Sequence, residues 1–305
     1  MHTQTMVTRI GLASVAAALC LALVSRAPPA AAQTPSAEMQ QKIEWCEGRN
    51  GAMSELRVEA CTALIQSGRL TGAELGAAFR NRCWATLTLG FTVKSKGQEA
   101  LADCDEALRL MPNDGKAIYT RAAVYARMRD HDRAIEEYTR LIALAPWSIN
   151  GLNNRAREYM LVGKYDLAIE DFTRSIEQNR TITSDSPDTL TVVTTLSNRC
   201  LVNGLAGRFE AALKDCDEAE RLGRGRQVPP LGERAIVHLK MGQLDLALAD
   251  CDAVLRLNPR NALFLYGRGF VKLRQGDAAG GNADIAAAKA INASVEQLFR
   301  DYKIE

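Results

Sequence analysis

The chain has 305 residues, of which 47% are hydrophobic and 24% are charged, a composition that favours a folded core over a disordered chain. The formal net charge at pH 7 is only +2. This balance does not favour nucleic acid or an anionic membrane surface as a partner.

The N-terminal segment, from Met1 to Ala32, has the layout of a secretory signal peptide. A short stretch ending at Arg9 precedes an apolar run from Ile10 to Val24, and small residues follow as far as Ala32. A membrane-spanning helix needs roughly 20 residues, more than this run supplies. We expect cleavage after Ala32, no membrane span in the mature chain, and a periplasmic or secreted location. An uncleaved anchor is the alternative.

The rest of the chain repeats with a period of about 34 residues. One small residue recurs once in every unit, at Ala100, Ala134, Ala168, Ala212, Ala247 and Gly281. The intervals are nearly equal except between Ala168 and Ala212, where a polar insertion, 180–192, lengthens the unit. Each unit has two amphipathic helical patterns around a turn, which contains glycine in four units: Gly163, Gly207, Gly242 and Gly276. One such helix pair cannot bury its apolar stripe alone, so neighbouring pairs are expected to stack.

The repeat pattern divides the mature chain into three parts. Residues 33–75 are expected to form a degenerate helical hairpin, and residues 76–295 six regular units. A last amphipathic helix, of which 296–305 is the C-terminal part, carries an apolar stripe of Val295, Leu298, Phe299 and Tyr302. This stripe is expected to cap the open end of the stack.

The segment GLNNRAREYMLVGKYDLAIEDFTRSIEQN resembles the tetratricopeptide repeat family in the spacing of Tyr159, Gly163, Tyr165, Ala168 and Phe172. Arginine stands where the family usually has leucine in the first helix, and Gly281 replaces the small alanine. The resemblance implies an all-α fold in which helical hairpins stack in a right-handed superhelical solenoid.

Two charged positions recur in every unit when its small residue is numbered 20. Position 7 is arginine in five units, as Arg121, Arg155, Arg199, Arg234 and Arg268. In the first unit the corresponding residue is Arg82, which a five-residue insertion in the hairpin displaces from position 7. Position 23 is acidic in Asp103, Glu137, Asp171, Asp215, Asp250 and Asp284. Antiparallel helices that turn near positions 15 and 16 bring positions 7 and 23 together, so each arginine should face the carboxylate of its own unit. An anion-binding surface is the alternative. A structural contact is expected, because the pair recurs in every unit.

The cysteines follow the same mirror relation in a chain expected to meet an oxidising compartment. Three pairs straddle three predicted turns, and they predict disulfides between Cys46 and Cys61, Cys83 and Cys104, and Cys200 and Cys216. Cys251 should remain free, since Ala235 stands where its partner would be. Buried thiols are the alternative. A zinc site is not expected without a Cys-x-x-Cys or paired histidines. In the motif DCDEA, Asp105 and Glu106 are expected to face solvent.

No catalytic motif is recognisable in the sequence. Glycine-rich phosphate loops, nucleophile elbows and zinc-protease motifs are missing, and His131 and His238 lie apart from any nucleophile motif. We therefore expect no enzyme activity, no cofactor and no metal. Clustering of either histidine with carboxylates in space would favour an enzyme.

The family resemblance implies that the first helices of successive units line a concave groove for a protein or peptide partner. By position, this groove would present Trp84, Tyr119, Arg127, Asn153, Arg157, Tyr266, Phe270 and Arg274. Tyr266 and Phe270 could instead pack within the helix layer. The expected function is an exported, non-enzymatic scaffold. The alternatives are a receptor or carrier for a small envelope ligand, and an accessory subunit of an envelope enzyme.

Overall fold

A computed structural model describes the backbone of residues 36–89, 94–182, 189–223 and 231–301. The predicted signal peptide lies outside these ranges, as does Tyr302. Residues 183–188 of the predicted insertion are also outside, whereas its two flanks extend neighbouring helices.

The described chain consists of helices without strands. Their order is α1 Ala37–Cys46, the short 3-10 helix η1 Arg49–Gly51, α2 Ser54–Gln66, α3 Gly72–Leu89, α4 Lys94–Leu110, α5 Gly115–Arg127, α6 His131–Leu144, α7 Ile149–Leu161, α8 Tyr165–Ile182, α9 Thr189–Leu205, α10 Phe209–Gly223, α11 Leu231–Lys240, α12 Leu244–Leu257, α13 Ala262–Arg274, α14 Ala278–Ile291 and α15 Val295–Asp301.

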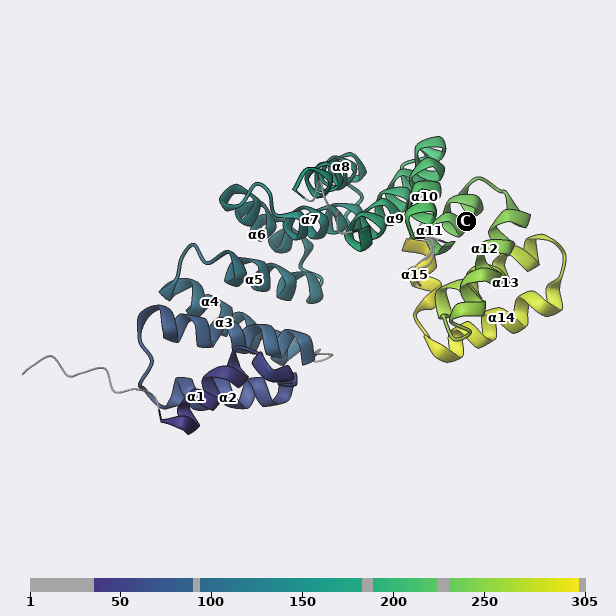
Figure 1. Cartoon of the computed structure of the whole chain (residues 1–305). Coiled ribbons are helices and arrows are strands. Elements are labelled where there is room, and N and C mark those ends of the chain that lie inside the picture. Colours follow the sequence, from purple (N-terminus) through teal and green to yellow (C-terminus); the bar gives the residue numbers. More distant parts are fainter. Residues whose placement is uncertain (1–35, 90–93, 183–188, 224–230, 302–305) are drawn as a thin grey trace, which may run out of the picture.

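Consecutive helices pack as antiparallel hairpins, and the hairpins stack along an arc (Figure 1). The pairs are α1 with α2, α3 with α4, and so on to α13 with α14. The predicted fold class, an all-α solenoid of stacked helical hairpins, is confirmed. In the described part of the chain, no helix is both long enough and apolar enough to cross a bilayer.

The four turn glycines have a left-handed backbone conformation, which glycine adopts without steric cost. Gly163, Gly207, Gly242 and Gly276 have φ angles of 78°, 77°, 71° and 90°. A Cβ atom at these positions would meet no neighbouring atom within 4 Å. The left-handed backbone is therefore the reason for glycine there. The second unit has Arg129 at the matching place, with a φ of 62°.

Each hairpin is held by a small residue and by larger side chains around it. Ala100, Ala134 and Ala168 have no exposed surface. Alanine at this position lets the two helices approach closely, while Tyr138 and Phe172 fill the space one turn further along the second helix. The sequence repeat therefore places the same kind of buried contact in successive hairpins.

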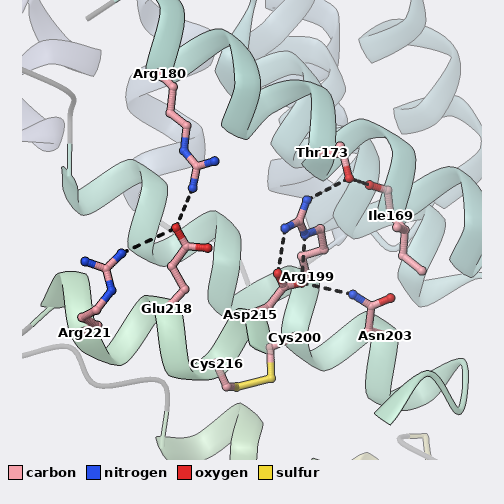
Figure 2. Close-up of polar contacts among 10 residues, drawn as sticks. All are labelled: Ile169, Thr173, Arg180, Arg199, Cys200, Asn203, Asp215, Cys216, Glu218 and Arg221. Atoms are coloured by element: carbon pink, nitrogen blue, oxygen red, sulfur yellow. Dashed lines mark hydrogen bonds and ion pairs between the residues drawn. A yellow bond between two sulfur atoms is a disulfide. The ribbon is translucent and has the colours of Figure 1, made fainter. Parts of the chain in front are cut away.

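All six predicted arginine–carboxylate pairs are present. In five units the arginine Nε and Nη2 atoms donate to the two oxygens of one aspartate, at distances of 2.6 to 2.9 Å. Figure 2 shows this arrangement for Arg199 and Asp215. The pairs are largely buried: the side chains of Arg155 and Asp171 are 12% and 3% exposed.

The third nitrogen of each arginine reaches the preceding hairpin. Nη1 donates to the second helix of that hairpin, at Thr62, Asp105, Thr139, Thr173, Glu220 and Asp252 in chain order. Each guanidinium therefore joins two helices of its own unit and one helix of the previous unit. We call this series of contacts the arginine ladder. Asp105 is exposed, as predicted, and it also accepts a bond of 2.7 Å from Arg121. Glu106 forms an ion pair with Arg109.

The three predicted cysteine pairs lie at disulfide-bond distance. The Cα–Cα separations are 4.8 Å for Cys46 and Cys61, 5.6 Å for Cys83 and Cys104, and 5.4 Å for Cys200 and Cys216. Figure 2 shows the bond between Cys200 and Cys216. Cys251 is free and buried. A disulfide across a hairpin favours the folded state mainly because it restricts the unfolded chain.

Candidate functional site: the concave face

The first helix of each hairpin lies on the inner side of the arc. The neighbouring first helices α3 and α5, and likewise α9 and α11, contact each other more extensively than neighbouring second helices do. Helices on the inside of a curved stack are closer together than those on the outside. The concave face is therefore lined by α3, α5, α7, α9, α11 and α13.

The N-terminal half of this face contains an open cavity of about 710 Å3. Its walls come from α3, from α5, from Leu141 of α6 and from the start of α7. The residues that line it are Arg80, Asn81, Trp84, Asp114, Gly115, Lys116, Tyr119, Thr120, Leu141, Ser148 and Asn150. Two of the predicted groove residues, Trp84 and Tyr119, are thus brought together here.

An aromatic group forms one side of this cavity. The ring centroids of Trp84 and Tyr119 are 6.2 Å apart, and Tyr119 meets the buried Tyr138 edge to face at 6.0 Å. The Tyr119 hydroxyl accepts a bond of 3.0 Å from the Asn154 amide. Burial raises the pKa of the Tyr138 phenol. Trp84 and Tyr119 are half-buried, and these contacts fix their rings in place, as a rigid binding surface requires.

Most of the other residues that line the cavity are polar. Arg80 donates to Asp114 at 2.6 Å, and Asp114 also accepts from the backbone N–H of Ala117 at the start of α5. The charge of Arg80 is therefore compensated within the protein. Lys116 is exposed at the edge of the cavity. The cavity offers apolar surface together with hydrogen-bonding groups and an exposed cation.

The other predicted groove residues of this half differ in exposure. Arg157, on α7, and Arg127, at the end of α5, are exposed. Asn153 is half-buried, and its amide donates to Thr195 of α9 at 3.0 Å, which ties two neighbouring units together. Arg157 is placed to contact a partner, whereas Asn153 already has a structural contact.

The C-terminal half of the concave face is occupied by the chain itself. Phe299 of α15 lies against Tyr266 and Phe270, with ring centroids 5.0 and 5.5 Å away. The guanidinium of Arg274 lies 4.7 Å from the centre of the Phe270 ring. Tyr266 and Phe270 are therefore packed against this last helix and do not line an open groove. This is closer to the alternative prediction, in which the two residues pack within the helix layer.

The position of α15 differs in part from the expected cap. Val295 covers the last hairpin, where it packs with Leu265 and Ala288, and it also belongs to the same cluster as Leu255 of the preceding hairpin. Phe299 instead reaches the concave face, and Leu298 is 38% exposed. Sequence reasoning missed this contact. The apolar stripe was visible, but nothing in the repeat pattern indicates which surface receives it.

Both histidines of the described chain lie near carboxylates. His131 Nδ1 is 2.6 Å from the buried Glu158 of the next unit, and His238 Nε2 is 3.8 Å from Asp250. Asp250 is already bound by two nitrogens of Arg234. Among the described residues, no group of three or more His, Cys, Asp or Glu side chains could hold a metal ion. The two contacts join neighbouring helices in the same way as the arginine ladder.

Comparison with protein families matches residues 115–146 and 149–182 to the tetratricopeptide repeat. These segments are the α5–α6 and α7–α8 hairpins. Comparison of the sequence with curated proteins found no significant match.

Solved structures show the same fold at low sequence identity. A tetratricopeptide repeat protein from Parabacteroides merdae is 18% identical, with a TM-score of 0.69 over 88% of this chain and 100% of its own. The apo form of RapI is 10% identical, with a TM-score of 0.62 over 85% and 99%. Pseudomonas aeruginosa pilF is 18% identical, with a TM-score of 0.53 over 74% and 98%. The chain therefore contains two tetratricopeptide repeats, and its stacked hairpins have the fold of tetratricopeptide repeat proteins.

Proposed function

We propose that the protein is an exported, non-enzymatic scaffold that binds a segment of a partner protein in the N-terminal half of its concave face. The observation that carries this proposal is the open cavity beside Trp84 and Tyr119. Rigid aromatic side chains that keep exposed surface are typical anchors of protein interfaces. A stacked array of helical hairpins offers such a surface without a catalytic group.

Two features support export. The segment from Met1 to Ala32 has the signal-peptide pattern, and three cysteine pairs lie at bonding distance. Disulfides persist in oxidising compartments such as the bacterial periplasm. We therefore place the mature chain in the periplasm or outside the cell. Mass spectrometry of the protein recovered from the cell envelope tests this: the first residue should be Gln33, and reduction with alkylation should add mass for six more cysteines.

The binding site is tested by recovering partners from envelope extract with the mature chain as bait. Trp84→Ala and Arg157→Ala should each reduce recovery of the partner at least tenfold, whereas Arg256→Ala should leave it unchanged. Arg256 is a matched control because it is also exposed but lies on the second helix α12. Circular dichroism must show that all variants remain folded. Equal recovery with Trp84→Ala, Arg157→Ala and the unmodified chain would contradict the proposed site.

A small-ligand carrier is the second candidate, because a volume of about 710 Å3 lies in the range of small-molecule pockets. Native mass spectrometry distinguishes the two functions. A carrier should retain a small molecule that Trp84→Ala releases, whereas a scaffold should retain a polypeptide.

A further inference from the structure

The last helix places one aromatic side chain in an apolar depression of the concave face. Phe299, which is 3% exposed, packs in one cluster with Leu201 of α9, Ile236 and Leu239 of α11, and Val271 of α13. Tyr266 and Phe270 lie directly against its ring. We call the residues around this ring the Phe299 seat. Figure 1 shows α15, at the yellow end of the chain, beside α11.

The seat lies mainly on first helices, with Ala247 of the second helix α12 in the same cluster, rather than in the core of one hairpin. Its residues come from three successive units, and Phe299 reaches them from outside the repeat pattern. Each unit packs on its neighbour through its own residues, so the stack does not need Phe299 to continue. Val295, four residues earlier, separately covers the last hairpin.

The helix that carries Phe299 is weakly supported. It has seven residues and follows α14 after residues 292–294. Helices shorter than about 12 residues are marginal in water by themselves, so α15 depends on docking. Its polar side is exposed, where Glu296 pairs with Lys289 and Arg300. Phe299 is thus held by its contacts with the seat rather than by a rigid helix.

A second cavity adjoins this helix. It has a volume of about 870 Å3, and Leu298 and Arg300 of α15 line it together with Met160 and Leu161 of α7 and Leu205 of α9. The lining of this cavity is mixed, because Arg129, His131 and Gln297 contribute polar groups beside the apolar side chains of α7 and α9. A helix longer than α15 would therefore gain contacts with α7 and α9 that Leu298, still 38% exposed, does not complete.

We propose that the Phe299 seat is a second protein-binding site, and that an amphipathic helix of a partner protein enters it by displacing Phe299. The partner's anchor is an aromatic side chain that replaces Phe299, followed by apolar residues that reach toward Met160 and Leu205. The chain's own helix competes at an effective concentration on the order of millimolar. The seat therefore admits only partners that make more contacts than α15. This site and the Trp84 cavity lie on opposite halves of the concave face, so the two proposals fail independently.

The test uses the full mature chain and a fluorescent synthetic peptide with the sequence of residues 292–305. Phe299→Ala in the protein should strengthen peptide binding at least tenfold, because the internal competitor is lost while Val295 still covers the last hairpin. A peptide with the same Phe299→Ala change should bind neither protein. Leu257→Ala, at an exposed position at the end of α12, is the control and should bind the peptide as weakly as the unmodified chain.

Two results would overturn the proposal. One is a Phe299→Ala protein that is folded by circular dichroism yet binds the peptide no better than the unmodified chain. The other is an unmodified chain that forms a dimer in solution which Phe299→Ala abolishes, since the seat would then belong to a second copy's α15.

Hydrogen exchange of the unmodified chain gives an independent reading if the variant does not fold. Amides of α15 should exchange at least a hundredfold faster than those of α11 and α13, as expected for a helix that leaves its seat without unfolding the stack. Equal protection of all three helices would contradict a displaceable α15.

Discussion

At the scale of single residues, one arginine–carboxylate pair of the arginine ladder differs from the other five. Arg121 contacts Glu137 through a single bond of 2.6 Å, from Nη2 to Oε1. Its Nε atom and the Oε2 atom of Glu137 are buried without a partner. The other five units have aspartate at this position and form two parallel bonds. The extra methylene of Glu137 is the only difference in the carboxylate side chain.

We therefore predict that Glu137→Asp stabilises the protein, because it allows the second bond that the other units form. One restored hydrogen bond between charged groups should raise the free energy of unfolding by about 1 kcal/mol. Asp171→Glu in the third unit is the reverse change and should lower it by a similar amount. Urea denaturation of both variants checks the pair of signs. If both variants changed the free energy of unfolding in the same direction, the number of hydrogen bonds in the arginine–carboxylate pair would not determine its contribution to stability.

At the scale of helices and hairpins, the mirror relation across a turn made most contacts predictable. Positions 7 and 23, and each cysteine pair, are separated by one turn, so local helix geometry determines their distance. The bond from Arg121 to Asp105 was also within reach of sequence analysis, since Thr62, Thr139, Thr173 and Asp252 stand at the position that matches Asp105. The position of Phe299 was not, because its neighbours Leu201 and Ile236 lie far away in the sequence and outside any repeated spacing.

The same mirror relation predicts a fourth disulfide that the sequence lacks. Ala235 and Cys251 stand 16 residues apart at the positions of Cys200 and Cys216, and both are buried. Ala235→Cys should therefore form a disulfide with Cys251 during folding and stabilise the protein by roughly 3 kcal/mol. Burial raises the pKa of the Cys251 thiol to about 12, so the folded wild-type chain should resist alkylation at pH 8.

Alkylation of the denatured, unreduced mature chain measures this bond. The wild type should take one alkyl group, at Cys251, and Ala235→Cys should take none. Ala235→Ser is the control for a polar atom at this buried site and should again take one. Two alkyl groups on the Ala235→Cys chain would refute the predicted pairing.

At the scale of the whole molecule, a stack of repeats has no single core. Each hairpin is stabilised by its own packing and by contacts with its neighbours, so stability varies along the chain. Among the residues that the structure describes, the N-terminal hairpin, α1 with α2, has a neighbouring hairpin on one side only. It lacks the position 7 to position 23 pair of the six regular units, although Thr62 accepts a bond from Arg82. The bond between Cys46 and Cys61 lies within its small apolar cluster.

These features predict that loss of this disulfide unfolds one end of the molecule rather than all of it. In a Cys46→Ala/Cys61→Ala variant, amides of α1 and α2 should exchange at least tenfold faster, while those of α7 and α8 should be unchanged. The reason is that the hairpin of α7 and α8 keeps a neighbouring hairpin on each side and its own arginine–carboxylate pair, Arg155 with Asp171. Cys200→Ala/Cys216→Ala is the matched comparison, because it removes a disulfide of similar loop length from an interior hairpin. Its effect should spread to α8 and α11, which pack on α9. Equal acceleration along the whole chain in both variants would mean that the stack unfolds as one cooperative unit, against the expectation for nearest-neighbour stabilisation.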